Sequence, residues 1–311
     1  MIWLPFYVLR FVAMKIQHFA FVFTVALWIL MLLAANIPLN DDRANSSLTS
    51  LGHRLFFDER LSLNATKSCA TCHAPELAFT DGYRQSIGIF ADKSPRNAPS
   101  LLNLDSYTSL NWADAQLVSI KDQIEGPLFG KHPIEMGADK NNAAALSFIY
   151  ADTAYTSLVA AAYPQKTKID WEDITEAIAA YTAGLKSRRA VVDMSTERLS
   201  ATEQQGRDLF ESPRLGCRKC HSGIDFNRPD DGIGNNFHDI GLGKVRTPSL
   251  RNVAITAPYM NNGSIENLTD CVKIFTSNAT LSTAEERALI TFLYTLTDTS
   301  YLADPYFRDP F

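Results

Sequence analysis

The spacing of apolar residues along this chain predicts a fold made mainly of helices. In residues 46–60, Leu51, Leu55 and Phe56 recur at the helical spacing of three and four. Ile174, Ile178, Tyr181 and Leu185 continue the pattern at about 170–185, and further helices are predicted at about 201–211 and 283–297. No clear alternation typical of β-strands appears beyond short stretches, so the predicted fold class is mainly α.

Polar residues and prolines mark where these helices begin and where loops intervene. Asp170 and Ser282 precede two of the segments, and each is followed by acidic residues in the first turn, as a helix start prefers. The stretch 74–140 is predicted to be rich in loops because prolines interrupt it, at Pro75, Pro95, Pro99, Pro127 and Pro133. Further loops are predicted around Gly232, Gly234, Gly241 and Gly243.

The first 38 residues have the composition of a secretion leader. Basic residues precede an uncharged run from Phe19 to Ala35. At about 17 residues this run is long for a signal peptide and short for a membrane span. Residues 1–38 are therefore predicted to be a signal peptide or an uncleaved N-terminal membrane anchor, starting at Met1 or Met14. The rest of the chain is predicted to be exported to the periplasm.

The overall composition excludes one class of partner. The chain has 29 Lys and Arg residues against 34 Asp and Glu residues, a net charge of −5, which argues against binding to nucleic acid. Its hydrophobic content of 46% is ordinary for a globular protein once the leader is discounted.

Two copies of Cys-x-x-Cys-His, at residues 69–73 and 217–221, carry the candidate chemistry. This pentapeptide is the attachment signal for c-type haem, because two thiols add to the two vinyl groups of one porphyrin and the next histidine binds the iron. Zinc would instead need four ligands in one cluster, and a redox dithiol does not need the histidine. Two covalent haem c groups are therefore predicted, held by Cys69, Cys72 and His73 and by Cys217, Cys220 and His221.

The two motifs lie too far apart in sequence for one small cytochrome domain. Each follows a predicted helix, so two cytochrome c-like helical lobes are predicted, at 39–195 and 196–311, with long loops between. Each lobe would hold one covalent haem. The fifth cysteine, Cys271, has no obvious partner and is interpreted as a small buried apolar residue.

Histidines are scarce enough to limit the ligands of the two irons. The chain has six, of which His73 and His221 are the predicted proximal ligands and His18 lies in the leader. Each of the other histidines is more often structural than a ligand in proteins; they are His53, His132 and His238. The shortage suggests that at least one iron keeps an open position, as activation of oxygen or peroxide requires.

Further motifs occur in a fixed order along residues 48–297. They are Leu51-Gly52-His53-Arg54-Leu55-Phe56-Phe57-Asp58, Arg96-Asn97-Ala98-Pro99-Ser100, Pro133-Ile134-Glu135-Met136 and Thr247-Pro248-Ser249-Leu250-Arg251-Asn252. With these motifs the chain resembles the bacterial dihaem cytochrome c peroxidases and their relative MauG. The segment 127–133 is most similar to the MbnH-like branch, whose members oxidise a tryptophan of a partner protein toward kynurenine.

The resemblance implies roles for three side chains. Glu135 matches the acidic residue over the peroxide-binding haem, where a carboxylate can take a proton from peroxide and return it to the leaving oxygen. Gln123 matches a glutamine of the same pocket, and Trp112 matches a tryptophan between the haems that relays electrons. From the residues alone, Glu135 could be a surface glutamate and Trp112 an ordinary core aromatic.

The resemblance also implies a calcium ion between the two haems. Asn97 and the backbone carbonyls of Thr256 and Pro258 match the residues of that site. Oxygen donors of this kind suit calcium.

Two departures from the family pattern concern the axial ligands. Many of the peroxidases have a displaceable histidine in the segment that matches 84–88, and this chain has none there, so the first haem is expected to be open. The family's second haem receives Met or Tyr at the position that matches Phe275, which cannot bind iron. The candidates for this ligand are Met260 and His238, unless the position is vacant.

Three functions fit these features. The first is an enzyme that uses hydrogen peroxide to oxidise a secreted or outer-membrane protein partner at a tryptophan side chain. The second is a peroxidase that takes electrons from a small redox protein, and the third is a dihaem electron-transfer cytochrome without enzymatic activity. The missing histidine and Phe275 favour the first over the second, while Glu135 and Gln123 oppose the third.

Overall fold

This computed structural model describes residues 46–194, 198–229, 237–239, 241 and 243–311. The predicted leader at 1–38 and the glycines at 232 and 234 lie outside the described residues. No helix in the described part of the chain is long and apolar enough to cross a membrane.

The mainly helical fold class is confirmed. The four predicted helices appear as α2 (Ser47–Phe57), α7 (Trp171–Ala183), α9 (Ala201–Glu211) and α11 (Thr283–Tyr294). The described strands are β1 (Phe237–Asp239) and β2 (Lys244–Arg246), which pair antiparallel. The side chains of Asp170, Ser200 and Ser282 cap α7, α9 and α11, each by accepting a hydrogen bond from a backbone N–H of the first turn.

One helix lies where the sequence predicted only loops. The remaining helices are α3 (Cys69–Cys72), α4 (Ile120–Phe129), α5 (Ser147–Ala151), α6 (Thr153–Ala162), α8 (Val191–Met194) and α10 (Leu268–Phe275). The prediction that Pro127 breaks regular structure is wrong, because Pro127 lies inside α4. It comes in the last turn, where it removes one backbone donor, and Gly130 still closes the helix by donating to the Gly126 carbonyl at 2.8 Å.

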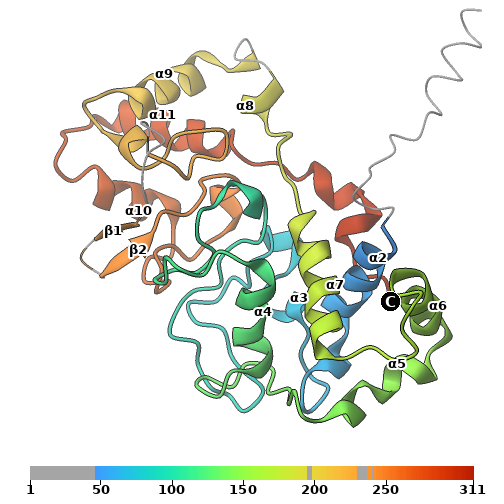
Figure 1. The fold of residues 1–311 in the computed structure, drawn as a ribbon. Coiled ribbons are helices and arrows are strands. Elements are labelled where there is room, and N and C mark those ends of the chain that lie inside the picture. The colour runs from blue at the N-terminus through green and yellow to red at the C-terminus, as the bar shows by residue number, and fades with distance from the viewer. Residues whose placement is uncertain (1–45, 195–197, 230–236, 240, 242) are drawn as a thin grey trace, which may run out of the picture. The chain divides into compact units, whose positions relative to one another are not determined.

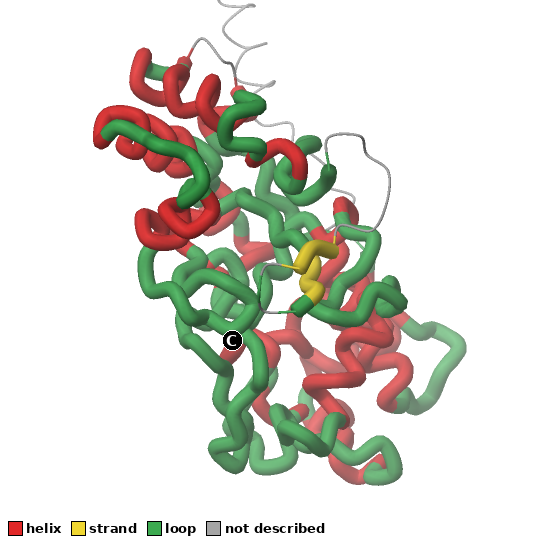
Figure 2. The backbone as a smooth tube through the Cα atoms, turned by 90° about the vertical axis from the view of Figure 1, so that its left-hand side faces the viewer, coloured by secondary structure: helices red, strands yellow, loops and turns green. Residues whose placement is uncertain are grey.

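The buried side chains form two separate cores. In the first, α2 packs against α7, with α4 and α6 alongside; in the second, α9 packs against α11 (Figures 1 and 2). The end of the chain belongs to the first core, since Tyr301, Tyr306 and Phe307 are buried among its members. The division of the chain into lobes at 195/196 stays a prediction.

A glycine brings the two main helices of each core into close contact. A Cβ added to Gly52 of α2 would lie 1.8 Å from the carbonyl oxygen of Ala177 in α7. A Cβ added to Gly206 of α9 would lie 1.9 Å from the carbonyl oxygen of Ala288 in α11. The same close approach in both cores indicates that α2 and α7 are structural counterparts of α9 and α11.

The counterpart relation extends to the segments that close each core. Residues 97–103 and 246–252 share the order Pro-Ser-Leu, and both end at an asparagine in the left-handed backbone conformation, Asn103 and Asn252. Asn103 Nδ2 donates to the Ser187 carbonyl at 2.9 Å, and Asn252 Nδ2 donates to Ser187 Oγ at 2.9 Å. The two closing segments therefore meet at one buried hydrogen-bond network, which joins the cores.

We predict that Gly52→Ala lowers the free energy of unfolding by at least the ~1–3 kcal/mol typical of overpacking, because the methyl group would meet rigid backbone. Denaturant unfolding of the dihaem protein measures this. The control is Gln205→Ala on the exposed side of α9, which lines neither cavity. It should change the free energy of unfolding by less than about 0.5 kcal/mol. Equal stability of the two variants would contradict the interpretation.

Candidate haem and peroxide site

Backbone carbonyls fix the histidine of each Cys-x-x-Cys-His motif. His73 Nδ1 lies 2.8 Å from the Phe79 carbonyl oxygen, and His221 Nδ1 lies 2.9 Å from the Phe226 carbonyl oxygen. Both phenylalanines have a positive φ, 60° and 52°, which turns the carbonyl back toward the ring. A carbonyl can only accept, so Nδ1 carries the proton and Nε2 keeps its lone pair.

Burial keeps both imidazoles neutral, the form that binds iron. It lowers the pKa of His73 and lowers the pKa of His221 to about 4. The cysteines lie within the same short turns, because the backbone N–H of His73 donates to the Cys69 carbonyl at 2.9 Å and that of His221 to the Cys217 carbonyl at 2.8 Å. All five cysteines of the chain are free of disulfides.

The first motif opens into a cavity of about 450 Å³, within the range of roughly 300–1,000 Å³ usual for cofactor pockets. Cys69, Cys72 and His73 line it, and so do the predicted catalytic residues Gln123, from α4, and Glu135. His132 also lines it. The structure thus brings both predicted distal residues into the cavity of the first motif.

The loop that carries Glu135 is fastened on three sides. The backbone N–H of Ile89 donates to the Glu135 carbonyl at 3.1 Å, and the N–H of Leu63 donates to the Met136 carbonyl at 2.9 Å. The N–H of Met136 in turn donates to the Pro127 carbonyl at 3.0 Å. Gly88 allows the closest approach, since a Cβ there would lie 2.0 Å from the Ile134 carbonyl oxygen. Glu135 therefore projects from a fixed backbone.

Burial raises the pKa of Glu135, and the nearby Asp81 carboxylate raises it further. A hydrogen bond with Ser94 opposes these effects. The same residues border the Cys72 thiol, because burial, Asp81 and Glu135 together raise the pKa of Cys72 to about 11. A carboxyl group that is poised to exchange a proton thus faces the first motif.

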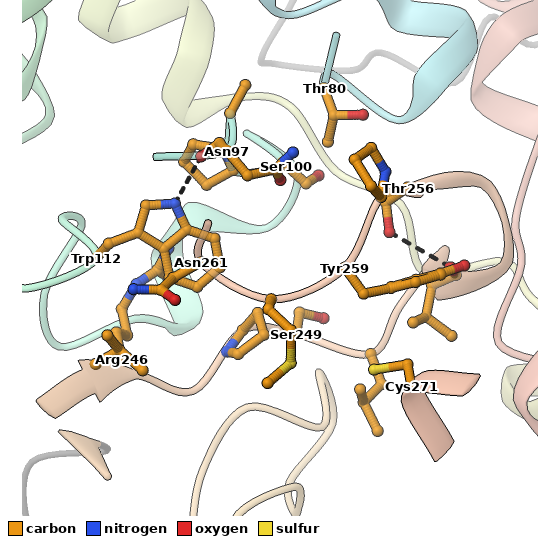
Figure 3. Close-up of a pocket in the computed structure, with 18 of the residues that line it drawn as sticks. Thr80, Asn97, Ser100, Trp112, Arg246, Ser249, Thr256, Tyr259, Asn261 and Cys271 are labelled. Carbon is orange, nitrogen blue, oxygen red and sulfur yellow. Dashed lines mark hydrogen bonds between the residues drawn. The ribbon is translucent and has the colours of Figure 1, made fainter. Parts of the chain in front are cut away.

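The second motif opens into a narrower cavity of about 150 Å³ (Figure 3). His221, Met260, Cys271 and Phe275 line it. Met260 has a φ of 71°, which is uncommon for a residue with a side chain and often marks a functional position. The other candidate ligand, His238, lies on β1 outside the lining of this cavity.

The fifth cysteine is partly buried, whereas the sequence interpretation made it a buried residue, and it lines the second cavity. Cys271 packs against the second core, and burial raises its pKa to about 11. Its thiol is therefore protonated under ordinary conditions.

Trp112 forms part of the wall between the two cavities and lines both. Its indole Nε1 donates to the Asn97 carbonyl at 2.8 Å, as Figure 3 shows, and its own carbonyl accepts from the backbone N–H of Arg246 at 2.8 Å. Trp112 is thus hydrogen-bonded to both closing segments, 97–103 and 246–252. These two hydrogen bonds fix the position of the Trp112 ring relative to both Cys-x-x-Cys-His motifs.

The predicted calcium residues come together, although the ion itself stays a prediction. Asn97, Thr256 and Pro258 all line the second cavity. The Asn97 side-chain amide donates to the Tyr83 carbonyl at 2.8 Å. In the described part of the chain, no three side chains of His, Cys, Asp or Glu gather as a metal site, so a calcium ion would depend on amide and carbonyl oxygens.

These observations fit a covalent haem at each motif. Each copy presents a pair of free thiols on one turn and a neutral imidazole whose Nε2 lone pair is available. Each imidazole lines a cavity. A zinc ion would need four such ligands together, and the described residues offer no such group.

Comparison with known proteins agrees with this site. The family described as di-haem cytochrome c peroxidase matches residues 46–201. The methylamine utilization protein MauG of Methylorubrum extorquens is 31% identical over 70% of this chain, and the match spans 65% of that protein. The cytochrome c peroxidase Ccp of Escherichia coli is 30% identical over 72% of this chain and 52% of its own length.

A solved structure extends the likeness to the fold. The crystal structure of a MauG-like protein associated with microbial copper homeostasis has a TM-score of 0.79 and 34% identity, and the match covers 86% of this chain and 93% of that one. The helical fold and paired haem motifs thus define a dihaem peroxidase-type oxidoreductase with two covalently bound haem c groups. The chain belongs to the di-haem cytochrome c peroxidase and MauG family.

Two residues of the wall were missed from the sequence. Arg246 lines both cavities, and Tyr107 lies against it with the guanidinium carbon 3.9 Å from the ring centroid. The signal that could have found Arg246 is the repeated Pro-Ser-Leu order, which pairs it with Asn97 as a counterpart; no such signal marks Tyr107.

Proposed function

We propose that this protein is an exported enzyme that uses hydrogen peroxide at its first haem to oxidise a protein partner at a tryptophan side chain. The first haem would be attached through Cys69 and Cys72 with His73 as ligand, and the second through Cys217 and Cys220 with His221. The observation that carries the proposal is one arrangement: Glu135 and Gln123 line the cavity of the first motif, and Trp112 lies in the wall that this cavity shares with the second.

A haem held by Cys69, Cys72 and His73 would supply the binding of peroxide and the capacity to be oxidised. Glu135 takes the proton from one peroxide oxygen and returns it to the other, which leaves as water. Overall, one peroxide and two protons accept two electrons from the partner and yield two waters. Gln123 supports the pocket: its Oε1 lies 3.5 Å from Nδ2 of Asn111, the residue before Trp112.

An open first haem is supported by the side chains around it. Segment 84–88 contains no histidine, and Ser86 contributes the lining there. The histidine that could interfere is His132, which lines the cavity from an exposed position three residues before Glu135.

Trp112 is the proposed electron relay between the two haem sites. A protein substrate is too large to reach an iron enclosed in a cavity, so its electrons must pass through the chain. An indole gives up an electron more easily than a phenyl ring of the same shape, and Trp112 is fixed at both of its hydrogen bonds.

The proposed location of the protein and its partner follows from the covalent attachment of haem. Covalent haem attachment takes place outside the bacterial cytoplasm, so the protein and its partner are proposed to meet in the periplasm, with the chain either free or tethered by residues 1–38. The partner would be a secreted or outer-membrane protein.

The alternative function is that of a peroxidase that draws electrons from a small redox protein. The similarity to the Escherichia coli peroxidase favours it, and the absent histidine at 84–88 opposes it.

We expect Glu135→Gln to slow peroxide-dependent oxidation by about 10²–10⁴-fold, because the amide cannot accept the proton. In the wild type the rate should rise with pH through the Glu135 pKa, which burial places above the ordinary value of 4.5, since only the carboxylate acts as a base. Stopped-flow mixing with peroxide measures the rate of oxidation in the variant and its pH dependence in the wild type. The control is Glu125→Gln, a partly exposed glutamate of α4 that is paired with Lys140 and does not line the cavity. A loss of less than tenfold in Glu135→Gln would count against the role.

We expect Trp112→Phe to keep both haem spectra but to lose joint oxidation of the two haems and most turnover of the partner, because phenylalanine preserves the shape of the wall but is far harder to oxidise. The matched control is Trp171→Phe, a buried tryptophan of the first core that lines neither cavity. Visible spectroscopy after one equivalent of peroxide distinguishes the variants. If Trp112→Phe behaves like Trp171→Phe, the relay lies elsewhere.

We propose Met260 as the second ligand of the second haem, because it lines the His221 cavity and His238 does not. Met260→Gly suits the left-handed backbone and removes the sulfur, so it should convert this haem from low spin to high spin. Electron paramagnetic resonance reports the change. His238→Ala should leave the low-spin signal in place; loss of that signal in His238→Ala alone would assign the ligand to His238.

A further inference from the structure

Arg246 is a buried cation without a counter-ion among the described residues. Its side chain is 3% exposed, and neither its Nε nor its Nη1 has a hydrogen-bond partner in the described part of the chain. Burial lowers its pKa, and a hydrogen bond with the Tyr107 side chain only partly opposes this effect. An unpaired charge in a protein interior costs several kcal/mol, so an anion is expected to complete the site.

The surroundings of Arg246 limit where that anion can be. The guanidinium carbon lies 3.9 Å from the centroid of Tyr107 and 5.5 Å from that of Trp112, so aromatic rings pack against the group. The backbone N–H of Arg246 is fixed by its hydrogen bond to the Trp112 carbonyl. The remaining directions are the two cavities, both of which Arg246 lines. Figure 3 shows Arg246 among the residues of the second cavity.

The two unpartnered nitrogens can serve two different anions. Nε and Nη1 donate from opposite edges of the planar guanidinium, so one carboxylate cannot satisfy both. Arginine is the side chain that best pairs with carboxylates in buried sites, because its donors form a rigid planar fork. Haem c carries carboxylates of its own on its propionate arms, and each cavity holds one predicted haem site.

We propose that Arg246 binds one propionate carboxylate from each haem and thereby links the two haems electrostatically. This inference rests on the two haem sites proposed above but not on peroxide chemistry, so it can fail while the proposed enzyme activity stands. A cation shared in this way disfavours the oxidised form of both haems, since the oxidised iron carries the larger positive charge. The reduction potentials of the two haems therefore both depend on one side chain.

The test is a spectroelectrochemical titration of the intact dihaem protein and its Arg246→Gln variant. The thioether bonds keep both haems attached, so loss of the anchor is separated from loss of the cofactor, and mass spectrometry verifies that two haems remain. We expect both midpoint potentials to fall in Arg246→Gln and to move back toward the wild-type values in Arg246→Lys, which restores the charge. Unchanged potentials, or a change in one haem only, would overturn the proposal.

The matched control is Arg251→Lys. Arg251 is equally buried but lines only the second cavity, and its guanidinium is already paired with Asp193 at 2.7 Å and Asp225 at 2.8 Å. The Arg251→Lys variant should leave the midpoint potential of the first haem unchanged. Should the Arg246 variants not accumulate with two haems, a crystal structure of the wild-type holoprotein decides. Nε and Nη1 must then contact carboxylates of different haems, and contact with one haem or with water alone refutes the link.

Discussion

The hydrogen bond from a histidine ring to a backbone carbonyl is the interaction on which both halves of this protein depend. It fixes the orientation of His73 and of His221 and leaves the lone pair on Nε2 of each ring. The acceptor residues, Phe79 and Phe226, reach this geometry only in the left-handed backbone conformation. The neighbouring chain stabilises that strained turn: the hydroxyl of Ser100 donates to the Ala78 carbonyl at 2.6 Å and that of Ser249 to the Asp225 carbonyl at 2.6 Å.

Because the serines belong to the closing segments, the same segments that hold the histidine turns also build the wall between the cavities. Segment 97–103 accepts the indole hydrogen of Trp112, and segment 246–252 donates to the Trp112 carbonyl. The asparagines at the ends of both segments bond to Ser187. A change in one histidine turn is thus connected through a few hydrogen bonds to Trp112 and to the other turn, as the proposed joint action of two haems would require.

Sequence patterns predicted the helices and several site residues because these depend on local chemistry. Asp170 and Ser282 mark helix starts through their capping side chains, and the spacing of each Cys-x-x-Cys-His motif is itself the attachment geometry. The prediction of a loop at Pro127 was wrong because the sequence does not show that this proline lies in the last turn of a helix, where it can be accommodated. Arg246 could not be found from charge alone, since its importance comes from lining two cavities that segments distant in sequence enclose.

The two halves differ most where counterpart residues face the cavities, and this difference explains how a repeated framework can perform two tasks. Asn97 and Arg246 occupy equivalent places in the closing segments, yet one offers a neutral amide and the other a charge. The first cavity is wide and contains a carboxyl group with a raised pKa, whereas the second is narrow and bordered by Met260, Cys271 and Phe275. The wider cavity and its carboxyl group suit the proposed entry of a small oxidant and the proposed proton transfer. The proposed division of tasks, with peroxide at the first haem and electron transfer at the second, thus has a counterpart in the side chains by which the two cavities differ.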